Sequence, residues 1–314
     1  MGELATVNTD SRIMTINAIA QLIERYIAAL DVKPRSKEGY RKGVNRFFEW
    51  LADKGITNPA REDILAYKAE MLTQYTACTV STYLTAVKSF FTYLEGEKIS
   101  PNIANGIKGA KHQRGFRKDA LTPAQANRVI GTIDTSTTEG KRNYALVNLL
   151  IRTGLRTIEA ERATVGDIRS ETGEALLYIQ GKGRDSKDAF VVLTESTLQP
   201  IKEYLRERGK LQDTAPLFAS HSDRNNGEGI TTRSISRIAK EALRAAGYDD
   251  SRLTAHSMRH TAVTLSLMGG ASIQEAQALA RHQNINTTLI YAHNIDRIAK
   301  APERKVDALL AGYV

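Results

Sequence analysis

The chain has 314 residues, of which 41% are hydrophobic and 25% charged, and it carries a formal net charge of +9 at pH 7. This length is sufficient for two domains with a core each, and the positive charge favours a polyanionic partner, DNA or RNA before a membrane. A basic protein that merely stays soluble would have the same charge balance, so charge alone identifies no partner.

The residue types present exclude several classes of site. Cys78 is the only cysteine, which rules out an intramolecular disulfide and a cysteine-based metal cluster, and we expect it to be an ordinary buried thiol. Six scattered histidines do not make a metal site, and no glycine loop ends in Gly-Lys-Ser/Thr, so no metal and no other cofactor is expected. Because neither a signal peptide nor a run of roughly 18 apolar residues occurs, we expect a cytoplasmic protein.

The first third of the chain is predicted to be a small all-helical domain. Residues 1–12 are polar and typical of a flexible tail. From residue 13 to about residue 110 apolar residues recur at helical spacing, most clearly between Val80 and Leu94. One helix face carries basic residues that are candidates for DNA-phosphate contacts, although a solvated face would have the same composition. These candidates are Lys33, Arg35, Lys37, Arg41 and Lys42.

Residues 111–120 are expected to be an interdomain linker, because they lack periodicity and contain glycine. Arg114, Arg117 and Lys118 make this linker basic, so we expect it to cross the DNA backbone; a plain solvent-exposed tether is the alternative.

The remainder, residues 121–314, is predicted to be a mixed but mostly helical domain. Thr122 to Gln125 has the pattern of a capped helix start, and two strand-like runs, 175–180 and 189–193, flank a glycine-rich turn. Helices then dominate to an amphipathic tail that begins at about residue 294. The fold class is therefore mainly α with a small β-sheet.

Arginines and histidines in this second domain form two local patterns. Arg156 follows a Gly-Leu step, and Glu159 lies one turn later, so its guanidinium can bind a phosphate oxygen or form a structural ion pair. His256 and Arg259 are three residues apart and share one helix face. Guanidinium groups match the spread charge of a phosphate, and imidazoles can shuttle protons near neutral pH.

A third pattern places His282 nine residues before Tyr291. A tyrosine hydroxyl is a poor nucleophile at its ordinary pKa near 10 and needs a proton acceptor and a cationic surround. Together the patterns supply what is needed to break a phosphodiester with a tyrosine oxygen. We expect His260, which directly follows Arg259, to be a packed, hydrogen-bonded histidine and not a catalytic one.

Between Leu150 and His293 these motifs resemble the tyrosine recombinase (phage integrase) family, whose signature runs Arg, Lys, His-x-x-Arg, His or Trp, Tyr. The resemblance covers nearly the whole chain and is closest to the simple, Xer-like two-domain type. It implies a SAM-like core-binding domain, a catalytic domain and a 3′-phosphotyrosine intermediate without cofactor. The catalytic residues that it implies are Arg156, Lys182, His256, Arg259, His282 and Tyr291, with Glu159 in support.

Two details of the signature are less regular. Lys182 lies in the glycine-rich turn, where the family places a lysine that protonates the leaving 5′ oxygen, and Lys187 is a nearby rival. Ala280-Arg281 stands where Leu-Gly commonly precedes the histidine of the family. Because glycine tolerates positive φ and close packing that arginine does not, this departure leaves the geometry of the turn open but not the identity of His282.

The resemblance also implies a site-specific DNA recombinase that acts as a homotetramer on two double-stranded DNA sites. The tail would dock on a neighbouring protomer or pack on its own domain. We favour integration and excision of a bacterial or phage mobile element, without an arm-site-binding domain, over Xer-like chromosome or plasmid dimer resolution and over inversion. Two other classes use similar residues, a type IB topoisomerase-like relaxing enzyme and a DNA-binding protein that has lost its activity.

Overall fold

The computed structural model describes residues 8–9, 12–13, 16–111, 119–181, 184–222, 225–300 and 302–311. The chain divides into two compact units, residues 1–114 and residues 115–314. Within the described ranges, no helix has both the length and the apolar character that crossing a membrane requires.

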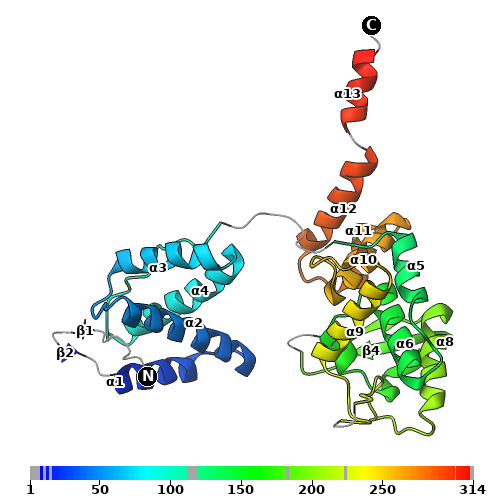
Figure 1. Ribbon diagram of the computed structural model, residues 1–314, viewed down its shortest axis with the longest axis horizontal. Helices are drawn as coiled ribbons and strands as arrows, with labels where there is room; N and C mark the ends of the chain where they lie inside the picture. The colour runs from blue at the N-terminus through cyan, green and yellow to red at the C-terminus, as the bar shows by residue number, and fades with distance from the viewer. Residues whose placement is uncertain are drawn as a thin grey trace. The chain divides into compact units, whose positions relative to one another are not determined.

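The described part of the first unit is a bundle of four helices, blue to cyan in Figure 1. A short antiparallel pair of strands, β1 (Asn8–Thr9) and β2 (Arg12–Ile13), precedes them. The helices are α1 (Ile16–Ala29), α2 (Pro34–Asp53), α3 (Arg61–Gln74) and α4 (Ala77–Gly96).

Aromatic side chains fill the centre of this bundle. Phe48 and Phe90 pack edge to face with ring centroids 5.6 Å apart, and both side chains are buried. Gly43 allows α2 to approach α4 closely, because a Cβ atom at this position would lie 2.6 Å from the Cβ of Ala86. The aromatic residues of these helices therefore serve as core, as the periodicity predicts.

The expectation of a buried Cys78 is wrong. Cys78 is exposed in the first turn of α4, on the face opposite the buried Val80. Two residues of helix turn by about 200°, so a thiol two positions from a core residue points away from the core.

The second unit contains nine helices of α type in its described part, one 3-10 helix and a small sheet. Figure 1 shows them from green to red. The helices and the 3-10 helix are α5 (Pro123–Gly131), α6 (Thr138–Thr153), α7 (Thr157–Glu161), η1 (Val165–Asp167), α8 (Glu195–Glu207), α9 (Thr232–Ala245), α10 (Ala255–Met268), α11 (Ile273–Ala280), α12 (Ile285–Lys300) and α13 (Pro302–Ala311).

The sheet has three antiparallel strands in the order β3 (Ile168–Glu171), β4 (Glu174–Ile179) and β5 (Ala189–Val192). The two predicted strand-like runs coincide with β4 and β5. Strand β3 was not predicted, because it is four residues long, mostly exposed and has one apolar residue, Ile168. Without apolar alternation, such a strand leaves no periodic signal. The fold class, mainly helical with a small sheet, is confirmed.

Helix α6 is the central helix of this unit and contacts α5, α8, α9 and α10. Leu146 and Leu150, four residues apart, are both buried in its core. The helix ends at Gly154, which has a left-handed φ of 61°. A Cβ atom there would lie 3.2 Å from the Cβ of Ala262 on α10. Glycine thus lets the chain leave α6 close to α10, just before Arg156.

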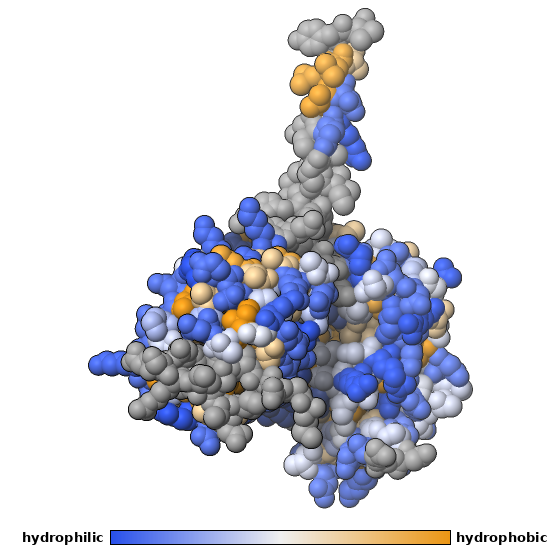
Figure 2. Space-filling model, turned by 60° about the vertical axis from the view of Figure 1, so that its left-hand side comes forward, coloured by the Kyte–Doolittle hydropathy of each residue, from blue (hydrophilic) through white to orange (hydrophobic). Residues whose placement is uncertain are grey.

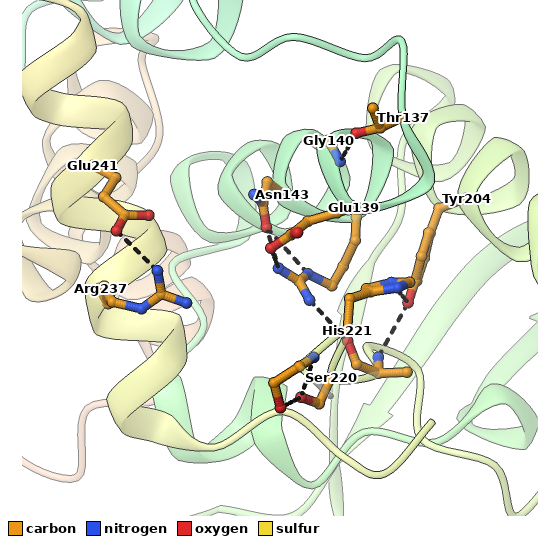
Figure 3. Close-up of polar contacts among 12 residues, drawn as sticks. Thr137, Glu139, Gly140, Asn143, Tyr204, Ser220, His221, Arg237 and Glu241 are labelled. Atoms are coloured by element: carbon orange, nitrogen blue, oxygen red, sulfur yellow. Dashed lines mark hydrogen bonds and ion pairs between the residues drawn. The ribbon is translucent and has the colours of Figure 1, made fainter. Parts of the chain in front are cut away.

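A separate polar cluster fixes the loop after α8 to α6 (Figure 3). Arg142, which is 3% exposed, donates to the carbonyl oxygen of Ala219 at 3.1 Å and pairs with Glu139 at 2.9 Å. The hydroxyl of Tyr204 accepts from the Ala219 N–H at 3.1 Å and lies 3.4 Å from His221 Nε2. Because the buried guanidinium has its partners within the fold, this cluster serves the architecture.

Candidate active site

The signature residues that the structure describes come from four segments of the second unit. Arg156 precedes α7 as its N-cap residue, and His256 and Arg259 lie in the first turns of α10. His282 lies between α11 and α12, and Tyr291 belongs to α12. Helices α10, α11 and α12 contact one another, and Arg156 Nη2 donates to the carbonyl oxygen of Arg281, so segments more than 100 residues apart in sequence meet at one place.

Glu159 is the buried centre of this site, with no exposed surface. Its Oε1 accepts from Arg156 Nη1 at 2.7 Å, and its Oε2 accepts from the Arg156 backbone N–H at 2.8 Å. Arg281 Nη2 donates to Oε2 at 3.0 Å. Burial raises the pKa of Glu159, but Arg281, the backbone N–H and the Arg156 guanidinium outweigh burial and lower it. The carboxylate is therefore ionised and orients both guanidiniums.

Arg259 is 2% exposed and bonds to two main-chain oxygens. Its Nη1 donates to Gly154 O at 2.5 Å, and its Nη2 donates to Ala280 O. Burial, followed by the nearby Arg156 and Arg281, lowers the pKa of Arg259 to about 9. The guanidinium remains a cation at neutral pH, held beside Arg156, where a phosphate could bind both.

His282 is fixed at both its ring and its backbone. Its Nδ1 lies 2.9 Å from the Oγ1 of the buried Thr288, and its carbonyl oxygen accepts from Gln277 Nε2 at 2.9 Å. Burial lowers the pKa of His282 to about 4, and the positive charges of Arg259, Arg156, Arg281 and His256 act in the same direction. The ring is therefore neutral at pH 7.

The hydroxyl of Tyr291 lies 2.5 Å from His260 Nδ1, and the tyrosine is 4% exposed. Burial raises the pKa of Tyr291 to about 12, against the effect of Arg259. Burial lowers the pKa of His260 to about 4, assisted by the charges of His256, Arg259 and His282 and opposed by Asp119. With its proton on Nε2, the neutral imidazole of His260 accepts a hydrogen bond from the protonated Tyr291 hydroxyl through Nδ1.

His260 is buried and hydrogen-bonded, as its position predicted, and its partner is the hydroxyl of Tyr291. Its contact with Tyr291 spans 31 residues of sequence. The available signal was a second histidine directly after His-x-x-Arg. His256 is exposed, and its ring meets that of His260 edge to face with centroids 4.7 Å apart.

Lys182 lies outside the described residues. The rival, Lys187, is anchored, because its Nζ lies 2.7 Å and 2.5 Å from the two carboxylate oxygens of Asp167. Asp167 is 4% exposed, so this pair ties the turn between β4 and β5 to η1. Arg184, also in this turn, pairs with Asp188.

The basic candidates of the first unit have different surroundings. Lys33, Arg35 and Lys42 are exposed. Arg41 forms ion pairs with Glu24 at 2.8 Å and Glu38 at 2.7 Å, and Lys37 Nζ donates to a carbonyl oxygen of α1. Arg114, Arg117 and Lys118 lie outside the described residues.

Two family models match the chain. One, the phage integrase family, matches residues 119–297, and the other, the phage integrase N-terminal SAM-like domain, matches residues 19–98. A tyrosine recombinase XerC of Herpetosiphon aurantiacus is 30% identical over 296 residues, which cover 89% of this chain and 93% of the relative. A tyrosine recombinase XerD of Listeria monocytogenes is 28% identical, covering 87% of this chain and 90% of the relative.

Solved structures share the fold. A XerH site-specific recombinase bound to palindromic difH substrate in a post-cleavage complex has a TM-score of 0.72 at 21% identity, covering 90% of this chain and 84% of that one. A lambda integrase tetramer bound to a Holliday junction has a TM-score of 0.67 at 18% identity, covering 87% and 76%. The chain therefore belongs to the phage integrase family and is a tyrosine recombinase, an enzyme of site-specific DNA recombination.

Proposed function

We propose that Tyr291 is the nucleophile and that the surrounding side chains bind one DNA phosphate. The observation that supports this most directly is the 2.5 Å contact between the Tyr291 hydroxyl and His260 Nδ1, on a helix that also carries Arg259. A phenol with a raised pKa needs an acceptor at the moment of attack, and a neutral imidazole at this distance can take the proton.

In the proposed reaction, the tyrosine oxygen forms a bond to phosphorus as the bond from phosphorus to the 5′ oxygen breaks. The phenol proton moves to His260, and Lys182 donates a proton to the leaving 5′ oxygen. Arg156 and Arg259 bind the nonbridging oxygens, whose negative charge increases in the transition state. His282 and the exposed His256 complete the phosphate contacts. A 5′ hydroxyl of a partner duplex reverses each step and releases Tyr291.

The protein partner in this proposal is a second copy of the chain. Helix α13 exposes Val306, Leu309 and Leu310, and Figure 2 shows a hydrophobic patch on this helix. An apolar groove of the second unit is lined by α5, α6 and α10, with Ile130 and Leu265 among its side chains. We propose that α13 of one copy occupies this groove of the next, which would build a homotetramer on two DNA sites.

DNA contacts in the first unit are assigned to exposed basic residues. Lys33, Arg35 and Lys42 are exposed and can therefore reach phosphates, and the linker residues Arg114, Arg117 and Lys118 belong to the same proposal. Arg41 contributes less, because its two carboxylate partners offset its charge.

Integration and excision of a mobile element, in the cytoplasm of a bacterial host, is the role that we propose. Xer-like dimer resolution is the second candidate, since relatives named XerC and XerD are similar over most of the chain. The two roles are separated with the DNA site that the covalent capture described below recovers. Recombination between two plasmids that carry this site is compared with recombination at the same site placed beside the host replication terminus.

Covalent capture on DNA of random sequence tests the chemistry whatever the target site is. Wild-type protein and Tyr291→Phe are incubated with nicked duplexes of randomised sequence, and phenol-extractable protein–DNA adducts are recovered, sequenced and digested. We expect the wild type to give an adduct on the peptide containing Tyr291 and the variant to give none. An adduct on another residue, or an undiminished adduct with Tyr291→Phe, would overturn the assignment. Joining of two recovered duplexes distinguishes a recombinase from an enzyme that only relaxes DNA.

A further inference from the structure

Arg281 adopts a backbone conformation that side chains rarely accept. It is the residue that ends α11, and its φ of 54° and ψ of 45° are left-handed. This region crowds Cβ against the carbonyl oxygen, so glycine is the usual occupant. An arginine in this conformation costs backbone free energy, which the contacts of its side chain and carbonyl oxygen can offset.

The side chain of Arg281 reaches back to the buried carboxylate at the centre of the site. Its Nη2 lies 3.0 Å from Glu159 Oε2 and 3.3 Å from Gly154 O, while its Nη1 donates to Leu279 O at 2.6 Å. The side chain is 14% exposed and that of Glu159 is 0% exposed. Glu159 therefore shares its two oxygens between Arg156 and Arg281.

The backbone at this turn bonds to both phosphate-binding arginines. Ala280 O accepts from Arg259 Nη2, and Arg281 O accepts from Arg156 Nη2 at 3.3 Å. Gly154 O, at the end of α6, accepts from Arg259 Nη1 at 2.5 Å. Carbonyls at helix C-termini carry partial negative charge, so the ends of α6 and α11 hold the guanidiniums between them.

We propose that Arg281 is a positioning residue that sets the two phosphate-binding arginines in place for cleavage. By pairing with Glu159, Arg281 fixes the turn whose carbonyl oxygens orient Arg156 and Arg259. It also offsets the negative charge of Glu159, so that the positive charge of Arg156 remains available to the phosphate. With glycine at 281, the turn would form without strain, but Glu159 would face Arg156 alone. This inference rests on the proposed function, because it assigns Arg156 and Arg259 to the phosphate.

Arg281→Gly is the informative substitution, because it suits the left-handed backbone and removes the guanidinium together with the rest of the side chain. Lys98→Gly is its matched control, since Lys98 also has a left-handed φ, of 58°, but lies beyond α4 in the first unit. We expect Arg281→Gly to form the covalent adduct roughly a hundredfold more slowly, as misplaced catalytic groups do. Its affinity for the recovered duplex should be unchanged, and Lys98→Gly should cleave at the wild-type rate. Arg281→Lys should recover part of the loss.

Coupling to Glu159 separates positioning from a general structural role. In a Glu159→Gln background, Arg281→Gly should slow cleavage by much less than it does in the wild type, because both changes remove the same interaction. Additive losses, or a loss of cleavage that follows a loss of folded protein or of DNA affinity, would overturn the proposal. Wild-type cleavage by Arg281→Gly would do the same.

A measurement without DNA tests the positioning role of Arg281 independently of whether Tyr291 is the nucleophile. The carboxyl carbon of Glu159 is followed by NMR during acid titration of the whole chain. We expect Arg281→Gly to move its ionisation to higher pH and Tyr291→Phe to leave it unchanged. If Tyr291→Phe still formed the adduct, the proposed function would fail while this titration still reported on Arg281. An unchanged titration in Arg281→Gly would contradict the positioning role.

Discussion

His260 Nδ1 and the hydroxyl oxygen of Tyr291 lie 2.5 Å apart, in an interior where the histidine is 7% exposed and the tyrosine 4%. Replacing His260 with asparagine should slow adduct formation by roughly a hundredfold or more, because general bases contribute on that order. Hydroxide can replace the missing base, so the rate of adduct formation by this variant should increase as the pH rises into the alkaline range. Adduct formation from pH 6 to 10 measures both effects.

The matched control for this substitution is His221→Asn, since His221 also contacts a tyrosine, Tyr204, at 3.4 Å in the structural cluster of Figure 3. It should leave the rate per folded molecule unchanged. An asparagine at 260 that cleaves with the wild-type pH dependence would show that the contact does not carry the proton.

Acid should destabilise the second unit through His260 and His282. Both have a pKa lowered from 6.5 to about 4, so between these values the unfolded chain binds protons that the folded chain does not. The stability contribution is complete above pH 6.5 and is lost as the pH falls toward 4. Thermal unfolding at pH 7 and pH 5 should show a lower midpoint at pH 5. His260→Asn should narrow that difference, and an equal or larger difference in this variant would contradict the prediction.

Loss of the Glu159 charge should destabilise the fold. Glu159→Gln leaves the guanidinium of Arg281 buried with a neutral partner, and breaking a buried pair costs about 3 kcal/mol. Chemical denaturation measures the difference. Glu241→Gln is the control, because the Arg237–Glu241 pair is exposed on α9 and should contribute less than about 1 kcal/mol. Equal effects of the two substitutions would mean that burial of Glu159 adds nothing to its pairing.

The two turn lysines should respond differently to a better leaving group. Lys182→Ala should lose cleavage of an ordinary duplex but regain it when the 5′ oxygen is replaced by sulfur, because a thiolate leaves without a proton donor. Lys187→Ala loses the pair with Asp167 and should therefore alter the stability of the turn instead. If the sulfur substrate restored cleavage by Lys187→Ala instead, Lys187 would be the proton donor and Lys182 would not.

Charges on the apolar side of α13 should block assembly and leave the chemistry intact. Leu309 and Leu310 are 67% and 63% exposed, so the double substitution to aspartate disturbs little packing within the chain. On the recovered duplex, light scattering should show fewer copies per complex while a single nicked site is still cleaved. Arg304→Glu with Asp307→Lys, a charge exchange on the same helix, is the control. A normal tetramer from the aspartate variant would exclude α13 as the assembly element.

Local patterns predicted the elements and the short-range pairs, and tertiary contacts decided the rest. Periodicity from Val80 to Leu94 identified α4, and the three-residue spacing of His256 and Arg259 placed them on one helix. His260, the partner of Tyr291, lies 31 residues away, and Arg281, the second arginine that binds Glu159, lies 122 residues away, distances at which a helical period carries no information. Local sequence likewise gives no reason for an arginine with a left-handed backbone at position 281, because the reason is its long-range contact with Glu159.

The exposed thiol of Cys78 has a practical consequence. Since no other cysteine exists in the chain, one maleimide fluorophore attaches at a single defined point on α4. The native protein can therefore be labelled on its first unit without mutation, and energy transfer to dye-labelled DNA would time the arrival of that unit at a site. During storage without reductant, by contrast, two molecules can become linked by a disulfide between their Cys78 thiols.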